Sequence, residues 1–143
     1  MAIIMGPKNR VHLGKDVKIK DTDFFVTNSG HIWIDDYSDF GHHVNLLCGY
    51  HDYTVHNEKR FPYPDKGFDI KIGKGVLLCS CCIIIGPCTI GDNSIIEAGS
   101  VVVKENIQPD QFWAGDPARL IRKDSYLKPK ERYHLFNGDY NRS

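Results

Sequence analysis

The chain has 143 residues, enough for one domain with a modest core. Its 18 basic and 18 acidic residues cancel, which argues against a general nucleic-acid binder because such proteins usually carry a basic excess. No apolar run reaches the ~20 residues that span a bilayer. The opening MAIIMGPKNR has no basic region ahead of its apolar stretch, so we expect no signal peptide. Five cysteines, an odd number, indicate a reducing cytoplasm.

Aliphatic residues recur every six positions from near the start of the chain. Two weak hexads, LGKDVK and IKDTDF, cover residues 13–24, and the phase then slips by three residues near the turn signal NSG at 28–30. Three clear hexads, IDDYSD, FGHHVN and LLCGYH, cover 34–51. Because His42 and His43 lie inside a hexad, we expect a structural role for both.

The repeat is then broken by a segment of different composition. Residues 48–67 read CGYHDYTVHNEKRFPYPDKG, with two prolines, three tyrosines and mixed charges. A histidine, His51, stands where the break begins. We expect residues 51–69 to form a protruding loop, because proline-rich polar segments between periodic runs are typical of loops.

The clearest repeat follows the break. Six aliphatic residues stand six apart without a slip, and the fifth position of their hexads is mostly small: Ile72, Leu78, Ile84, Ile90, Ile96 and Val102. A period of six fits a short strand plus a turn, with three such units closing a triangular coil. We therefore predict one domain, residues 1–143, folded as an all-β parallel β-helix with coils at 11–50 and 70–107; a β-sandwich is the alternative.

The last part of the chain leaves the pattern. A solenoid needs a cap on its open end, so we expect residues 108–143 to be that cap, with a short helix near 129–136. The cluster CSCC at 79–82 does not suggest metal, because Cys79 and Cys81 are closer than the usual CxxC pair. We interpret these cysteines as packing thiols.

Taken together, these motifs resemble the hexapeptide-repeat acyltransferases, whose fold is a left-handed β-helix. The run IIGPCTIGDNSIIEAGSVVVKENIQPDQFWAGDPARLIRK, residues 84–123, is similar to their characteristic end. The segment GYHDY is similar to the GxHD of the galactoside, maltose and colanic-acid types of sugar O-acetyltransferase. The resemblance covers residues 30–123 and departs from the usual pattern at Glu97, where a glycine is usual.

The resemblance implies an acetyltransferase that moves an acetyl group from acetyl-CoA to a hydroxyl of a sugar or surface-glycan precursor. His51 would be the general base, on a loop that reaches a neighbouring subunit of a homotrimer. An imidazole suits this task because it exchanges a proton near neutral pH. Its orienting partner would be Asp52, a backbone carbonyl or a neighbour's carboxylate. The expected acceptor-binding residues are Tyr50, Asp52, Tyr53 and His56.

The resemblance also implies where acetyl-CoA binds. Small or polar residues would line a groove for its extended arm, and basic residues would hold its phosphates. The small or polar positions are Ser80, Ala98, Gly99, Ala114 and Gly115. The basic positions are Lys104, Arg119, Arg122 and Lys123.

Three other functions remain open from the residues. The first is N-acetylation of a nucleotide-linked amino sugar. The second is a γ-class carbonic-anhydrase-like enzyme, because His51 and His56 are spaced H-x₄-H and imidazoles bind zinc. The third is an inert scaffold. We expect no metal.

Overall fold

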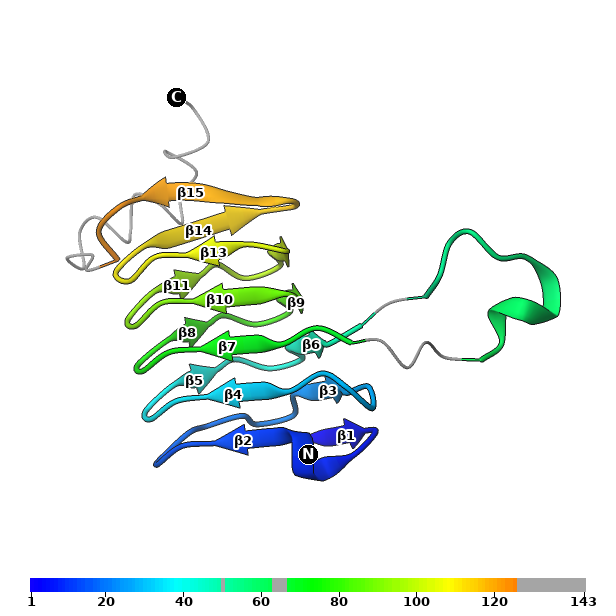
Figure 1. Ribbon diagram of the computed structural model, residues 1–143. Coiled ribbons are helices and arrows are strands. Elements are labelled where there is room, and N and C mark those ends of the chain that lie inside the picture. Colours follow the sequence, from blue (N-terminus) through cyan, green and yellow to red (C-terminus); the bar gives the residue numbers. More distant parts are fainter. Residues whose placement is uncertain (50, 63–66, 126–143) are drawn as a thin grey trace.

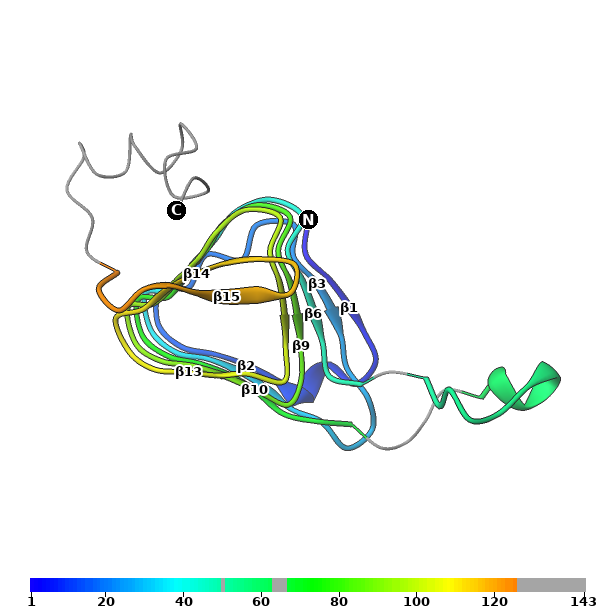
Figure 2. The same cartoon turned by 90° about the horizontal axis from the view of Figure 1, so that it is seen from above.

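The computed structural model describes residues 1–49, 51–62 and 67–125, which wind into a left-handed parallel β-helix (Figure 1). Viewed along its axis, the molecule is a triangular prism with one sheet on each side (Figure 2). This confirms the fold predicted from the period of six. No helix among the described residues is long and apolar enough to cross a membrane.

From the second coil on, each coil contributes a strand to each of three sheets, which we name A, B and C in chain order; the first coil reaches sheet C only through an isolated bridge between Lys18 and Asp39. Sheet A contains β1 (Ile3–Met5), β3 (Asp23–Phe25), β6 (Asn45–Leu47), β9 (Ile83–Ile85) and β12 (Val101–Val103). Sheet B contains β2 (Val11–Leu13), β4 (Ile32–Ile34), β7 (Ile70–Ile72), β10 (Cys88–Ile90) and β13 (Asn106–Ile107). Sheet C contains β5 (Asp39–Phe40), β8 (Leu77–Leu78), β11 (Ile95–Ile96), β14 (Phe112–Gly115) and β15 (Ala118–Arg122).

From Ile34 onward, the first residue of each hexad fills the interior. Leu46, Ile84 and Val102 are in register on successive strands of sheet A, and all three are fully buried. Similar side chains from sheets B and C complete one core along the axis. Because side chains alternate between the two faces of a strand, one large aliphatic residue per hexad is enough to build this core.

The fourth and fifth hexad positions make the corners. In most hexads the fourth residue adopts a left-handed backbone conformation, with φ of 66° at Cys81 and 72° at Gly99. The fifth points inward, and where it is serine its hydroxyl ties adjacent coils. Ser38 Oγ donates to Gly73 O at 2.7 Å and accepts from Val76 N at 3.1 Å. A small fifth residue is therefore needed to turn the corner and reach the next coil.

The two ends of the prism differ from the regular coils. β1 pairs with β3, so the first coil begins before residue 11, where the sequence predicts the coils to begin. At the other end, β15 runs antiparallel to β14, unlike the parallel strands below it. The predicted cap thus includes two strands of sheet C. The helix expected near 129–136 lies outside the described residues.

An arm, described at residues 48–49, 51–62 and 67–69, leaves the prism at the edge between sheets A and B, here called the AB edge (Figures 1 and 2). It carries a short 3₁₀ helix, η2 (Asn57–Arg60). The arm is anchored where the phase slips. Gly67 N donates to Ser29 Oγ at 2.6 Å, and Phe68 N donates to Cys48 O at 2.5 Å. The three-residue slip near NSG therefore supplies a side-chain anchor for the arm.

Candidate active site

His51 lies at the start of the arm, in a recess of about 360 Å³ that it shares with Asp52, Tyr53 and Arg60. His51 and Tyr53 are exposed, as a side chain that receives a substrate from solvent must be. Three predicted site residues are thus brought together. Tyr50, predicted beside them, lies outside the described residues.

Arg60 is a member of this recess that sequence reasoning missed. It lies at the end of η2, so the fold of the arm returns it to the segment near His51. Its Nε donates to Val55 O at 2.7 Å, and its Nη2 lies 3.2 Å from His56 Nδ1. A guanidinium only donates, so His56 Nδ1 accepts. That contact would compete with a metal at His56, which weighs against the anhydrase-like alternative.

Asp52 is held by its own turn. Its Oδ1 accepts from Thr54 Oγ1 at 2.6 Å and from Thr54 N at 2.8 Å. These two hydrogen bonds hold the pKa of the Asp52 carboxyl below its ordinary value, and the bond from the Thr54 side chain contributes more than the bond from its main chain. Asp52 is therefore ionised at neutral pH, and the oxygen Oδ1 is engaged by Thr54.

The residues predicted to contact coenzyme A gather mostly at another edge of the prism, where sheet C leads into sheet A of the next coil; we call it the CA edge. Ser80 and Gly99 are stacked there, with Gly99 N donating to Ser80 O at 3.0 Å. Gly115 N donates to Ser100 Oγ at 3.1 Å on the coil above. A Cβ on Gly99 would meet nothing within 4 Å, so this edge is open. Ala98 is exposed beside Gly99.

Ala114 and the basic residues are distributed differently. Ala114 is buried with Phe112 in a small cluster on the outer face of sheet C, opposite Trp113, which packs against the core. Arg119 pairs with Ala114 near the CA edge, whereas Arg122 pairs with Phe112 at the far end of sheet C, and Lys123 follows it. Lys104 lies elsewhere, directly after β12 at the AB edge.

His42 and His43 lie low on the CA edge, on the coil before Ser80. Their Nδ1 atoms are 3.4 and 3.3 Å from the two carboxylate oxygens of Asp21, and both side chains are exposed. The pKa of the Asp21 carboxyl is lowered from its ordinary value, and the largest cause is the hydrogen bond that it accepts from the main-chain N–H of His43. Ser80 Oγ accepts from His42 N at 3.0 Å, which ties this pair to the column of small residues.

Sheet A separates His51 from the column at the CA edge, and its outer face is apolar. On each of its five strands at least one outward residue is aliphatic or aromatic: Ile3, Met5, Phe25, Leu47, Ile83, Ile85, Val101 and Val103. Ile3 is 52%, Met5 41% and Val103 39% exposed. Sequence reasoning missed this face, although runs such as III and VVV, apolar at every position, were its signal.

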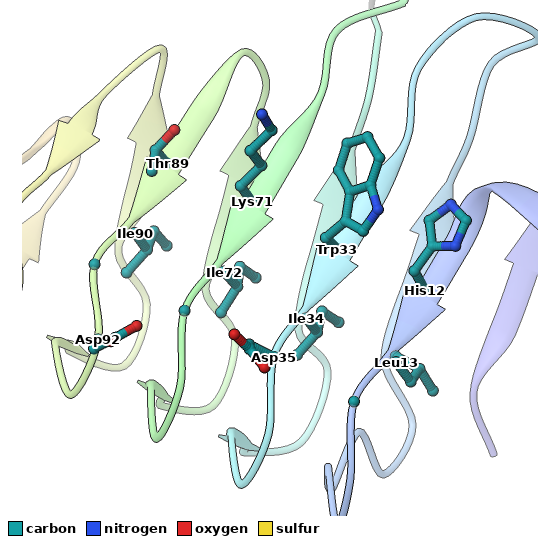
Figure 3. Close-up of a pocket in the computed structure, with 13 residues that line it drawn as sticks. His12, Leu13, Trp33, Ile34, Asp35, Lys71, Ile72, Thr89, Ile90 and Asp92 are labelled. Carbon is teal, nitrogen blue, oxygen red and sulfur yellow. The ribbon is translucent and has the colours of Figure 1, made fainter.

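The outer face of sheet B is polar and aromatic. A recess of about 620 Å³ crosses it, lined by His12, Trp33, Lys71 and Thr89 from four successive coils (Figure 3). No residue predicted for the site lies in this recess. The outer faces of sheets A and B therefore differ in composition, apolar on one and polar and aromatic on the other.

The family model "Bacterial transferase hexapeptide (six repeats)" matches residues 69–104. Galactoside O-acetyltransferase of Escherichia coli (strain K12) is 32% identical over 137 residues, which are 92% of this chain and 61% of that protein. The chain belongs to the hexapeptide-repeat acyltransferase superfamily.

Solved structures agree with this membership. A maltose O-acetyltransferase from Clostridium difficile 630 is similar with a TM-score of 0.69 and 28% identity, covering 85% of this chain and 64% of that one. A galactoside acetyltransferase in complex with coenzyme A is similar with a TM-score of 0.64 and 28% identity, covering 84% and 61%. The chain thus spans about three fifths of the length of these relatives.

Proposed function

We propose that this hexapeptide-repeat protein transfers an acetyl group from acetyl-CoA to a hydroxyl of a sugar, with His51 as the general base. The observation that carries the proposal is the placement of His51 in an open recess at the start of the arm. It is supported by two relatives, a galactoside and a maltose O-acetyltransferase.

The chemistry asked of His51 is the removal of one proton. As the acceptor oxygen attacks the acetyl carbonyl, the imidazole takes the hydroxyl proton, the carbon–sulfur bond of the thioester breaks, and the proton passes to the leaving thiolate. Such general base catalysis is worth about 10²–10⁴ in rate. Tyr53 and His56 would contact the sugar, since aromatic faces cover apolar sugar surfaces, and Asp52 would accept from sugar hydroxyls.

Acetyl-CoA would lie along the CA edge. The open surface at Ala98 and Gly99 leaves room for an extended arm beside the backbone. Arg119, at the same edge, would contact a phosphate, because a guanidinium donates two parallel hydrogen bonds to such a group. Arg122 and Lys123, at the far end of sheet C, would contribute less.

One copy of the chain holds the arm and the CA edge on opposite borders of sheet A, so the site needs a second copy. The apolar outer face of sheet A supports docking of a neighbour there, since exposed apolar patches of this kind mark protein interfaces. A closed ring of three copies would bring the arm of each onto the CA edge of the next.

The test is an acceptor screen with acetyl-CoA and thiol detection, run on the protein and on His51→Ala. We expect thiol release with one class of sugar, and a fall in kcat of about 10²–10⁴ in the variant with acetyl-CoA binding nearly unchanged. Thr89→Ala, which changes an exposed side chain on the outer face of sheet B, is the control and should keep its rate.

Other outcomes would contradict parts of the proposal. Acetylation at the amine of a nucleotide-linked amino sugar would overturn the hydroxyl acceptor. A His51→Ala variant with normal kcat would overturn the general base. Failure to bind acetyl-CoA would favour a scaffold.

A further inference from the structure

Three side chains on neighbouring coils form a hydrogen-bonded chain beside the base of the arm. Arg10 ends η1 (Lys8–Arg10), His12 lies on β2, and His31 directly precedes β4. Arg10 Nη1 is 3.0 Å from His31 Nε2, and His31 Nδ1 is 2.9 Å from His12 Nε2. We call Arg10, His31 and His12 the relay.

The relay continues into an aromatic stack. The His31 and Trp33 rings are 5.0 Å apart and inclined by 16°, and those of His12 and Trp33 are 5.3 Å apart and inclined by 13°. Lys71 Nζ lies 5.5 Å from the Trp33 ring centroid (Figure 3 shows His12, Trp33 and Lys71 in one row). The stack fixes the planes of the imidazoles, so their nitrogens face one another in a set direction.

The protonation states follow from the donors available. A guanidinium only donates, so His31 Nε2 must be the unprotonated acceptor. The proton of His31 is then on Nδ1, which donates to His12 Nε2, and the proton of His12 is on Nδ1. Both imidazoles are neutral in this arrangement. A further proton on either would point one N–H at another and remove a hydrogen bond.

The main chain of His31 holds the end of the arm. His31 N donates to Asp69 Oδ1 at 2.9 Å, and Ile70 N donates to His31 O at 2.9 Å. Asp69 ends the arm and Ile70 begins β7. His31 is therefore both a member of the relay and the residue whose main chain holds the end of the arm to the prism.

We propose that His31 is a positioning residue for the arm that carries His51, and that it acts only while the relay is neutral. The inference rests on the proposed function of His51. The groups that hydrogen-bond to His31 are Arg10, His12 and Asp69, while Lys71 lies over the neighbouring Trp33 ring and the buried thiol of Cys48 is near Asp69 and Arg10. A protonated His31 would lose its bond from Arg10 and face that cation, with Asp69 as the one carboxylate of the group.

The relay is intact while both imidazoles are neutral, and a proton added to either one removes a hydrogen bond from it. We therefore expect the arm to be anchored more firmly at pH 8 than at pH 5, the span in which histidine side chains in general change charge.

Amide hydrogen exchange of the full chain tests this. The readout is the protection of the Ile70 amide relative to that of Ile83, which donates to Ser100 O in sheet A. We expect this ratio to fall roughly five- to tenfold between pH 8 and pH 5, the loss of about one hydrogen bond. In His31→Leu, this protection ratio should be low at both pH values. His43→Leu, the matched control, should behave like the parent protein.

Arg10→Met provides a second variant, outside the strands, should His31→Leu fail to fold. It should lower the Ile70 protection at pH 8 and lower kcat severalfold with an unchanged KM for acetyl-CoA. A protection ratio that does not change with pH, or full protection of the Ile70 amide at pH 8 in Arg10→Met, would contradict the claim that the relay anchors the arm. A variant with lost protection and normal kcat would overturn its link to catalysis. A parent protein without acetyltransferase activity would contradict the proposed function alone, because the exchange result does not depend on turnover.

Discussion

The apolar face of sheet A gives the prediction that the structure specifies most closely, since docking of a copy there is what completes the proposed site. Ile85 lies in a row with Phe25, Leu47 and Val103, paired in register across four strands. Replacing Ile85 with Glu puts a charge at the middle of that row. In one isolated copy the change costs little, because the side chain is only partly buried there.

The cost in the assembly is larger. Covering an aliphatic side chain of this size contributes about 1.5–3 kcal/mol. Burying an unpaired carboxylate adds several kcal/mol more after relaxation. The sum is of the order that separates micromolar from millimolar binding, about 4 kcal/mol. At ten micromolar, the variant should therefore sediment as a monomer while the parent protein sediments as a trimer.

Sedimentation velocity at several concentrations is the assay. Thr89→Glu is the matched control, because Thr89 faces outward on sheet B and should leave the trimer intact. The far-ultraviolet circular dichroism of both variants should match that of the parent protein. A trimeric Ile85→Glu, or a parent protein that is monomeric at all concentrations, would refute the reasoning.

Two further predictions concern single side chains. Arg119→Ala should raise the KM for acetyl-CoA about tenfold at low salt, because it removes a charge-assisted hydrogen bond, and less at high salt, where screening is stronger. Arg122→Ala should raise this KM less. An equal effect of the two variants would contradict the placement of the phosphates near the CA edge. Burial raises the pKa of the Cys48, Cys82 and Cys88 thiols to about 12. At pH 8, iodoacetamide should therefore modify exposed Cys81 in the native protein and reach the three buried thiols only after unfolding. Labelling of the three buried thiols in the native protein, measured by mass spectrometry, would contradict this and show that the coils open.

Much of the fold could be predicted because one physical constraint repeats. Each hexad must place one large apolar residue inward and a small one at the corner, and Leu78 with Cys82 or Ile96 with Ser100 satisfy this in plain sequence. The phase slip near NSG was visible too. The structural role of this slip could not be predicted, because Ser29 anchors the arm through a contact with Gly67, 38 positions away in the sequence.

The site was predicted less completely. The sequence indicates His51 through its place at the break, and the small residues through their place in the hexads. It does not show that Arg60 returns to the recess, because η2 has no periodic signal. Nor does it show that Lys104 and Arg119 lie at different edges, since that depends on how the prism divides consecutive hexads among its three sides.

The central claim is that the active site is shared between copies, with His51 from one and the CA edge from the next. Co-expression of His51→Ala with Ala98→Trp, which blocks the open CA edge, tests it most directly. Each variant alone should be nearly inactive. In a mixed trimer one site joins an intact arm to an intact edge, so purified mixed trimers should recover about one third of the parent activity. Mixed trimers as inactive as the two variants would contradict the account and place the whole site within one copy.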